Sequence, residues 1–435
     1  MAENIAQTAT NTRRLPALDV LRGIAILGTL MANIWIFAYG GAGLAAMSKT
    51  SLQSQLAGLA AETEVAVSPL QQVGNSIDFG LSLLTDGKFI GLLTIMFGIG
   101  LEIQRQSALR RGDKWPGRYP WRAALLILDG LLNYIFIFEY DVLMGYGLTA
   151  LVVAAVLARN PKTQKIWMIV GVAVHVALMV GALLATWWVV NYGAEDESTA
   201  IAADDPVFTD TGSYVAQVQS RLEHFWLGRA EIPIMFFMGI GLFLVGAHLF
   251  RAGIFEPRGA KLRKWVLLGA FGLGLPLDWY LRIAHPEITA SFTRYVTSAI
   301  VALGILALVA GIYVHRAAAG KSSTGRIGTA FALVGRMALT NYILQNLIAS
   351  IIFYDWGFGV AAKIQGEAFA FWVLGCYVLI AGLLLLFSWA WLRKFQRGPV
   401  EELWHRSYTA IGERSERHAV RREARRAERR AQQRL

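Results

Sequence analysis

The chain has 435 residues, of which 55% are hydrophobic and 16% charged, and 41 Lys and Arg against 30 Asp and Glu give it a net charge of +11. Soluble domains carry about 25% charged residues, so this composition argues against a soluble protein. It also excludes intrinsic disorder, which needs low hydrophobicity and high charge. A disulfide scaffold is excluded because Cys376 is the single cysteine.

Apolar runs long enough to cross a bilayer recur along the whole chain. A hydrocarbon core about 30 Å thick needs about 20 apolar residues in a helix. The runs that meet or approach this length are 20–40, 88–104, 121–138, 141–158, 166–190, 232–250, 264–283, 295–315, 328–354 and 367–391. Residues 75–86 are amphipathic and are expected to form an interfacial or re-entrant piece. The sequence therefore predicts an all-α polytopic membrane protein with about ten transmembrane helices.

The basic residues are sorted between alternate connections of this topology. One side collects 34 of the Lys and Arg and the other side seven, whereas 18 of the acidic residues lie on the side that is poor in basic residues. Cytoplasmic loops carry the excess of Lys and Arg, so both termini are predicted to be cytoplasmic. Because topology explains the positive charge and no DNA- or RNA-binding motif accompanies it, no nucleic acid partner is expected.

Four segments follow from this topology. Residues 1–190 form a front half of five spans, 191–231 an acidic extracytoplasmic loop, 232–406 a back half of five spans and 407–435 a basic cytoplasmic tail. The tail carries nine Arg from Arg414 onward. It is either a solvated helical end or a segment attracted to anionic lipid headgroups, at roughly 1 kcal/mol per basic residue near the surface. The bilayer itself is the first expected partner.

Polar residues open the first span. An ionisable group inside a span costs at least about 2.5–3.5 kcal/mol, so each one is a candidate site residue. Asp19 and Arg22 are three residues apart and share a helix face, so they are either a local ion pair or part of a site at the cytoplasmic mouth. The planar fork of an arginine suits a phosphate-bearing donor. Asn33 extends this polar stripe into the membrane.

Further ionisable residues lie in the third span and at the outer level. Asp129 is in mid-span, with Asn133 one turn beyond it, and either hydrogen bonding or function accounts for it. Asp141, Asp78 and Lys88 lie at the outer level and could line one extracytoplasmic mouth. Two carboxylates with separated pKa values could there divide acid and base work. A solvated turn residue is the alternative for Asp141, and it is the less favoured one because Asp141 opens the next span.

The ninth span carries a polar face made by Asn341, Tyr342 and Gln345. Hydrogen bonding between helices explains such a face at about 0.6 kcal/mol per bond, and substrate binding is the alternative. No His, Cys or carboxylate spacing is typical of a metal site, and neither a phosphate-binding loop nor a dinucleotide fingerprint is present. No metal and no covalently bound cofactor are therefore expected.

Several stretches resemble the YeiB-like family of bacterial inner-membrane proteins, a domain of unknown function. The resemblance runs through nearly the whole chain in order. It rests on RLPALDVLRGIAILGTLMAN (14–33), KFIGLLTIMFGIGL (88–101), GLLNYIFIFEYDVLMGY (130–146), GRMALTNYILQ (335–345), FYDWG (353–357) and RGPVEELWHR (397–406). The family is similar to membrane-bound acyltransferases of the acyltransferase-3 and heparan glucosaminide acetyltransferase types.

The resemblance implies a location in the bacterial inner membrane and roles for particular residues. It carries over, as shared motif positions, Asp19, Arg22, Gly23, Lys88, Phe89, Asp141, Arg336, Asn341, Tyr342 and Gln345. One departure matters, because the family often has a His where this chain has Asn133. If that His is the base in the family, this chain either uses a carboxylate such as Asp141 or Asp78 in its place or has a different activity.

The first hypothesis is a transmembrane acyltransferase. An acyl-CoA donor would bind at the cytoplasmic mouth against Arg22, with Asp19 and Arg336 beside it. A hydroxyl or amine acceptor would enter from the acidic outer side and lose its proton to Asp141, Asp78 or Asp129. One alternative is a transporter that uses the same polar path. Another is a non-catalytic membrane partner whose basic tail recruits a protein or lipid.

Overall fold

The computed structural model describes residues 15–39, 68–192, 213–321 and 324–410, and these ranges contain helices and connecting turns but no strand. Much of the first outer connection, most of the acidic loop and the arginine-rich part of the tail lie outside the described residues.

The helices follow one another along the chain as α2 (Pro16–Ala38), α4 (Pro69–Thr85), α5 (Lys88–Arg110), α6 (Tyr119–Phe136), α7 (Leu143–Leu157), α8 (Pro161–Tyr192), α9 (Tyr214–Glu223), α10 (Phe225–Gly228), α11 (Ile232–Arg251), α12 (Ala260–Gly269), α13 (Leu275–Ala284), α14 (Pro286–Phe292), α15 (Ser298–Ala318), α16 (Gly325–Arg336), α17 (Ala338–Phe353), α18 (Val360–Lys363) and α19 (Phe369–Leu392). Short π-helical segments join α12 to α13 and α14 to α15. Residues 399–410 are also helical.

The prediction of an all-α polytopic membrane protein is confirmed. Within the described ranges, seven helical segments are long and apolar enough to cross a membrane, and α16 with α17 makes an eighth if the bent pair is one span. All ten predicted runs are helical, but α6 and α7 fall short of this criterion. Arg122, Asp129 and Asn133 reduce the apolar character of α6, and α7 has 15 residues.

Two details of the helix pattern differ from the sequence expectation. Residues 75–86 do not form a separate re-entrant piece, because α4 runs into α5 and together they make one candidate span, Pro69–Arg110. The interruption between them is Gly87, whose φ of 74° favours glycine. In the ninth run, α16 and α17 meet at an 85° bend at Met337.

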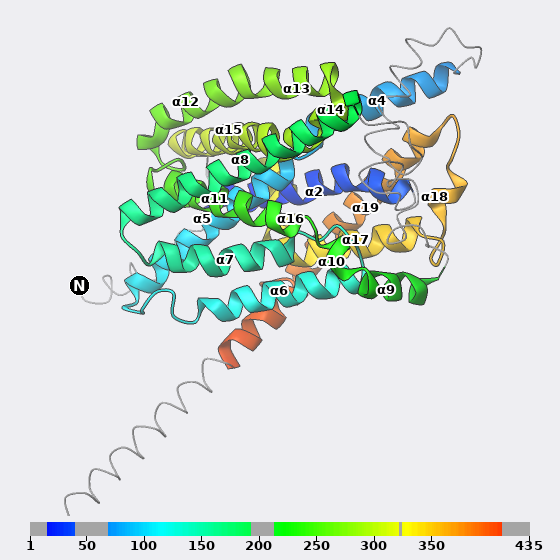
Figure 1. The fold of residues 1–435 in the computed structure, drawn as a ribbon. Coiled ribbons are helices and arrows are strands. Elements are labelled where there is room, and N and C mark those ends of the chain that lie inside the picture. Colours follow the sequence, from blue (N-terminus) through cyan, green and yellow to red (C-terminus); the bar gives the residue numbers. More distant parts are fainter. Residues whose placement is uncertain (1–14, 40–67, 193–212, 322–323, 411–435) are drawn as a thin grey trace, which may run out of the picture.

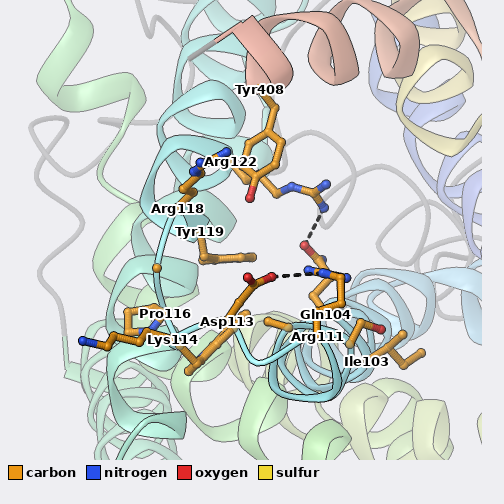
Figure 2. A pocket seen from close by; sticks show the side chains of 14 residues that line it. Ile103, Gln104, Arg111, Asp113, Lys114, Pro116, Arg118, Tyr119, Arg122 and Tyr408 are labelled. Carbon is orange, nitrogen blue, oxygen red and sulfur yellow. Dashed lines mark hydrogen bonds and ion pairs between the residues drawn. The ribbon is translucent and has the colours of Figure 1, made fainter. Parts of the chain in front are cut away.

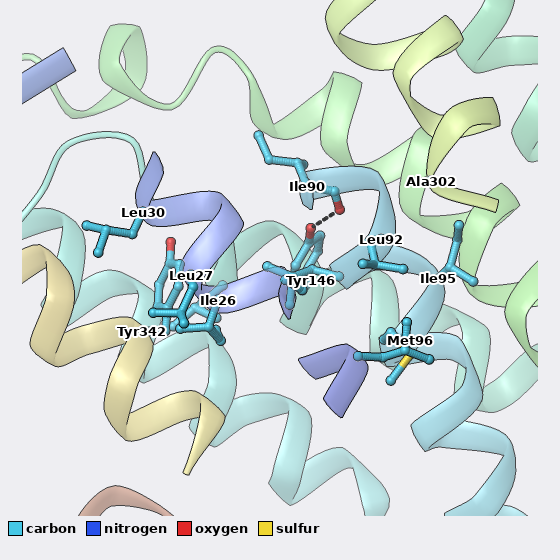
Figure 3. Close-up of a cluster of buried hydrophobic side chains, with 14 of the residues drawn as sticks. Ile26, Leu27, Leu30, Ile90, Leu92, Ile95, Met96, Tyr146, Ala302 and Tyr342 are labelled. Carbon is cyan, nitrogen blue, oxygen red and sulfur yellow. Dashed lines mark hydrogen bonds between the residues drawn. The ribbon is translucent and has the colours of Figure 1, made fainter. Parts of the chain in front are cut away.

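Helix α2 lies at the centre of the bundle. Most of its residues are buried, and α5, α16, α17 and α19 all pack on it. Apolar side chains of α2 and α5, among them Ile26, Leu30 and Met96, form the core (Figure 3). The front and back halves of the chain therefore interleave, since α2 and α5 pack on helices of the back half.

The contact between α2 and α16 is a close approach of two helix backbones. A Cβ atom added to Gly23 would lie 1.9 Å from the carbonyl oxygen of Phe331, and one added to Gly335 would lie 1.8 Å from that of Asp19. Small residues allow this kind of packing between membrane helices. Each helix thus contributes a glycine at which no other residue fits.

The outermost helices present apolar side chains to their surroundings. In Figure 1, α12 and α13 form one outer layer and α6 lies on the opposite side of the bundle. Trp265, Leu268 and Leu273 of the first layer are more than half exposed, and α8 carries a similar row of exposed apolar residues. Such surfaces are expected where a helix contacts lipid rather than water.

The glycine contact gives the first prediction. We expect Gly335→Ala to lower the free energy of unfolding by at least about 1–3 kcal/mol, because overpacking forces the backbones apart. The measurement is the thermal midpoint of the purified protein in detergent. Gly269→Ala is the matched control, because nothing lies within 4 Å of its added Cβ, and it should gain up to about 1 kcal/mol. Equal effects of the two variants would contradict the close contact.

Candidate functional site

A cavity of about 350 Å³ lies where Arg22, Arg122 and Arg336 come together. We call this end of the bundle, with residues 105–118 and 393–408, the basic end. The cavity is further lined by Ile26, Leu93, Met96, Phe97, Gly100, Gln104, Tyr119, Leu126, Val142, Leu143, Tyr146, Gly335, Ala338, Leu339, Tyr342, Glu401 and Trp404. Arg22 therefore lines a protein cavity that is open to the outside.

The backbone contact of α2 with α16 positions two of the three arginines. Arg22 directly precedes Gly23, and Arg336 directly follows Gly335. The helix contact at the two glycines therefore fixes the backbone from which each arginine side chain extends. Asp19 lies one turn before Arg22 and accepts a hydrogen bond from its Nη1 at 3.4 Å. The Arg22 side chain nevertheless keeps 35% of its surface exposed.

The bend at Met337 brings the start of α17 to the cavity. A helix that begins inside a bundle leaves its first N–H groups without helical partners. Glu401 provides the missing acceptor, because its Oε1 accepts hydrogen bonds from the backbone N–H of Leu339 at 2.9 Å and of Thr340 at 3.2 Å. Its Oε2 accepts from the Thr340 hydroxyl at 2.5 Å. A residue 61 positions away thus caps this helix.

Two tyrosines line the interior end of the cavity, among apolar side chains (Figure 3). The Tyr146 hydroxyl donates to the carbonyl oxygen of Ile90 at 3.1 Å and lies 2.8 Å from the hydroxyl of Thr94. The Tyr342 hydroxyl donates to Oδ2 of Asp141 at 3.4 Å. The cavity is therefore apolar within, basic at its mouth and bounded by phenol groups at depth.

Asp141 lies behind Tyr342 and is not among the residues that line the cavity. It is 7% exposed and accepts a hydrogen bond from Nδ2 of Asn133 at 2.8 Å. The backbone N–H of Met144 donates to its other oxygen at 3.2 Å. Asn133 thus helps to hold the Asp141 carboxylate in place.

Beyond Asp141, arginines from the segment before α11 close the opposite end. Arg221 Nη2 donates to Oε2 of Glu139 at 2.6 Å, and the Tyr354 hydroxyl donates to the same carboxylate at 3.1 and 3.2 Å. Arg229 donates to the carbonyl oxygens of Asp141, at 2.9 Å, and of Glu139. We call Glu139, Arg221, Arg229 and Tyr354 the distal cluster.

Two more pockets adjoin the cavity at the basic end. The larger, about 570 Å³, shares Gln104, Tyr119 and Arg122 with it. Arg122 Nη1 donates to Oε1 of Gln104 at 2.5 Å, so this bond lies where the two spaces meet (Figure 2). The pocket also carries Arg111, Asp113, Lys114, Arg118 and Tyr408.

The smaller pocket, of about 330 Å³, shares Arg122, Arg336 and Trp404 with the cavity. Beside it, Glu402 pairs with Arg406 and Arg397. The hydrogen bond from Arg406 holds the pKa of Glu402 below its usual value, so this carboxylate stays charged and engages the surface arginines.

Asp129 has a partner within the bundle. Its Oδ2 accepts a hydrogen bond from Nε1 of Trp404 at 2.6 Å, and Trp404 lines the cavity. Asp129 therefore does not line the cavity itself, but its carboxylate holds the indole of Trp404, which does.

The other predicted carboxylate and lysine lie elsewhere and not in one mouth with Asp141. Asp78 accepts a hydrogen bond from the Tyr39 hydroxyl at 3.4 Å. Lys88 forms an ion pair with Asp278 at 2.6 Å, and both side chains are almost fully buried. Arg282 joins Asp278 at 3.2 Å. The three groups expected around one mouth are thus in three separate environments.

The predicted amide residues are buried but none of them lines the cavity. Asn33 is 5% exposed on α2. Asn341 donates to the carbonyl oxygen of Val334 at 3.0 Å and to the hydroxyl of Ser388 at 2.9 Å, which is the contact between helices that the sequence offered as one explanation. Gln345 is fully buried, and neither amide atom has a hydrogen-bond partner among the described residues.

Most residues that line the cavity were not singled out from the sequence, among them Arg122, Glu401 and Trp404. Glu401 and Trp404 lie in the RGPVEELWHR stretch that carries part of the family resemblance. The motif was therefore recognised in the sequence, but its place at the cavity was not predicted. Within the described ranges, no group of three His, Cys, Asp or Glu side chains is placed to hold a metal ion.

Comparison with known proteins finds similarity to proteins of unknown function. Residues 249–410 match the family described as "Protein of unknown function (DUF418)". The chain is 28% identical over 406 residues to the uncharacterized protein YeiB of Escherichia coli, covering 89% of this chain and 94% of that protein. It is 25% identical over 425 residues to the uncharacterized protein YxaH of Bacillus subtilis, covering 92% and 95%. No solved structure matches the chain.

The distal cluster gives the second prediction. We expect Arg221→Met to lower the free energy of unfolding by about 3–5 kcal/mol, because it leaves the Glu139 carboxylate buried without its ion pair. Chemical unfolding in mixed micelles measures the change. Arg111→Met is the control, since its pair with Asp113 is more than half exposed on both sides and should contribute less than about 1 kcal/mol. A loss of equal size in the control would refute the assignment.

Proposed function

We propose that this chain, which is similar to YeiB of Escherichia coli over most of its length, is a transmembrane acyltransferase that takes an acyl group from an acyl-CoA-type donor at the basic end. The observation that carries the proposal is that Arg22 lines a cavity within the bundle, together with two further arginines and with apolar side chains. If Arg22 faced the bilayer or bulk solvent instead of this cavity, the acyltransferase proposal would lose its support and only the membrane topology would remain.

The shape of the space supports a donor of this class. The guanidinium groups of Arg22, Arg122 and Arg336 suit phosphate oxygens because their planar forks match phosphate geometry. The interior, with Ile26, Leu93 and similar side chains, suits the acyl chain. The adjoining 570 Å³ pocket, with its Arg and Lys side chains and Tyr408, gives room for the nucleotide part of the donor.

The reaction proposed is a transfer from a thioester to a hydroxyl or amine. The acceptor oxygen or nitrogen attacks the thioester carbonyl carbon, the new C–O or C–N bond forms, and the C–S bond breaks. The acceptor proton passes to a base and finally to the leaving thiolate. Tyr342 lines the cavity and contacts Asp141, so we assign the proton path to this pair, with Asp141 as the base and Asn133 as a positioning residue.

The path of the acceptor is the least constrained step. Entry from the acidic outer side, as expected from the sequence, requires the distal cluster to open, because Arg229 of this cluster donates to the carbonyl oxygen of Asp141. Entry through the basic end requires no such change. The proposal leaves the acceptor as a hydroxyl or amine compound.

A transporter is the second candidate, and one observation favours it. The 85° bend between α16 and α17 places the start of a helix inside the bundle, as in transporters with broken helices. In that case Asp141 and the distal cluster would form a gate, and the substrate would cross unmodified. The two candidates therefore differ in whether the thioester is cleaved.

The third prediction concerns donor binding. We expect Arg22→Ala to weaken binding of acetyl-CoA at least tenfold, which corresponds to about 1.4 kcal/mol. Gly100→Leu should weaken binding of longer acyl-CoAs, because a Cβ at Gly100 enters the cavity with Arg22 Nη2, 3.9 Å away, as its nearest neighbour. Titration calorimetry of the purified protein measures both changes.

Two matched controls accompany this titration. Arg110→Ala removes an exposed arginine of the same end, and Gly181→Leu fills an open position on α8 where nothing lies within 4 Å. Both should bind acetyl-CoA as the unmodified chain does. Absence of any binding heat with the unmodified protein, for short and long acyl-CoAs alike, would refute the donor assignment.

The fourth prediction concerns the proton path. We expect Asp141→Asn and Tyr342→Phe to slow the release of CoA thiol from acetyl-CoA by about 10²–10⁴-fold, the usual contribution of general-base catalysis, with donor affinity unchanged. Membrane vesicles that contain the protein and its natural acceptors are the sample. Tyr377→Phe is the control, because that hydroxyl bonds the Leu27 carbonyl oxygen away from Asp141.

A transporter gives a different result in the same vesicles. If the chain is a transporter, a labelled substrate would accumulate inside the vesicles without release of CoA thiol, and Asp141→Asn would change only this accumulation. That outcome would replace the acyltransferase assignment by the second candidate.

A further inference from the structure

A lipid-facing groove between α12 and α15 lies apart from the cavity of the proposed donor site. It is a shallow, open groove of about 700 Å³ that is lined by residues of both helices. Its lining residues are Pro257, Ala260, Arg263, Lys264, Leu267, Leu268, Ala307, Leu308, Gly311, Ile312, Val314, His315 and Ala318. The groove shares none of them with the cavity or its two adjoining pockets.

The two ends of the groove differ in chemistry. Lys264 and His315 lie toward the connections at 252–259 and 319–324, where both helices leave the bundle. Further along the same faces the lining is aliphatic, with Leu268, Leu308 and Ile312 all exposed. A cationic end followed by an apolar slot is complementary to a phospholipid, whose phosphate lies at the membrane surface and whose chains extend inward.

The cationic end is built into the fold. Arg263 is 8% exposed, and its Nη1 donates to the carbonyl oxygens of Ile254 at 2.8 Å and Glu256 at 2.7 Å. These bonds hold the guanidinium against the groove beside Gly311. Glu256, the acidic residue of this connection, is engaged by Arg258 at 2.5 Å.

The local charge is therefore positive where a headgroup would lie. Among the described residues, Lys264 has no carboxylate within ion-pair distance, and Lys261 is exposed one residue position from the groove-lining Ala260. Trp265 follows Lys264 and is 63% exposed, and tryptophan is enriched where a helix meets the membrane surface. Basic pockets between membrane helices bind anionic headgroups.

We propose that this groove is a binding site for an anionic phospholipid, with the phosphate held by Lys264 and His315 next to Arg263 and one acyl chain along Leu268, Leu308 and Ile312. The site is independent of the acyl donor, because it lies on the outer layer of the bundle and uses other helices. The lipid contacts both α12 and α15 and so holds these two helices together.

Lipid retention tests the proposal. The unmodified protein, purified in detergent and incubated with phosphatidylglycerol or phosphatidylcholine, is examined by native mass spectrometry and by its thermal midpoint. We expect phosphatidylglycerol to stay bound and to raise the midpoint, and phosphatidylcholine to do neither. Lys264→Glu should reduce the bound fraction at least tenfold.

Two further variants decide between the groove and nonspecific attraction. Gly311→Leu fills the groove without changing charge, and it should also displace the lipid. Lys162→Glu changes an exposed lysine at the start of α8 and should bind as the unmodified chain does. Equal loss in Lys162→Glu and Lys264→Glu, retention by Gly311→Leu, or equal binding of both lipids would each overturn the proposal, whatever the outcome of the acyl-CoA titration.

Discussion

The contact of the α2 and α16 backbones at Gly23 and Gly335 determines the geometry of the candidate site. Because no side chain separates the two helices there, the contact fixes the backbone positions of the neighbouring residues Arg22 and Arg336, and both of these residues line one cavity. The sharp bend after Arg336 then turns the chain inward, and Glu401 compensates the exposed N–H groups of α17. Loss of the close contact would move both arginines and the start of α17 together.

Much of the fold could be predicted from hydropathy, and the parts that could not share one cause. Each of the ten apolar runs is a helix, because burial in lipid requires the backbone to satisfy its own hydrogen bonds. Hydropathy says nothing, however, of where a helix bends. The start of α17 after the bend at Met337 is capped by Glu401, and α4 is separated from α5 at Gly87, and neither feature alters the mean hydropathy of a window.

The site was predictable in part for a similar reason. Arg22, Arg336 and Tyr342 were singled out and do line one cavity, since costly polar groups in a membrane protein are directed toward the protein interior. Asp78 and Lys88 were grouped with Asp141 because they lie at one level of the predicted topology. The depth of a residue in the membrane does not specify which helices are neighbours. In the structure, Asp78 is hydrogen-bonded to Tyr39 and Lys88 is paired with Asp278. Conversely, Arg122 was passed over because it lies in the first turn of α6, and Trp404 because it lies beyond the last predicted span, within the helical residues 399–410.

The ion pair between Lys88 and Asp278 bears on how the protein is made. The two residues are 190 positions apart, and Asp86 beside them is engaged by Arg282 and Arg294, which also come late in the chain. A ribosome therefore delivers the start of α5 to the membrane well before any of its charge partners exists. Until α13 is inserted, Lys88 lacks its carboxylate partner Asp278 and is expected to remain near water. Assembly of this bundle is consequently a late event in biogenesis, completed after translation of the back half.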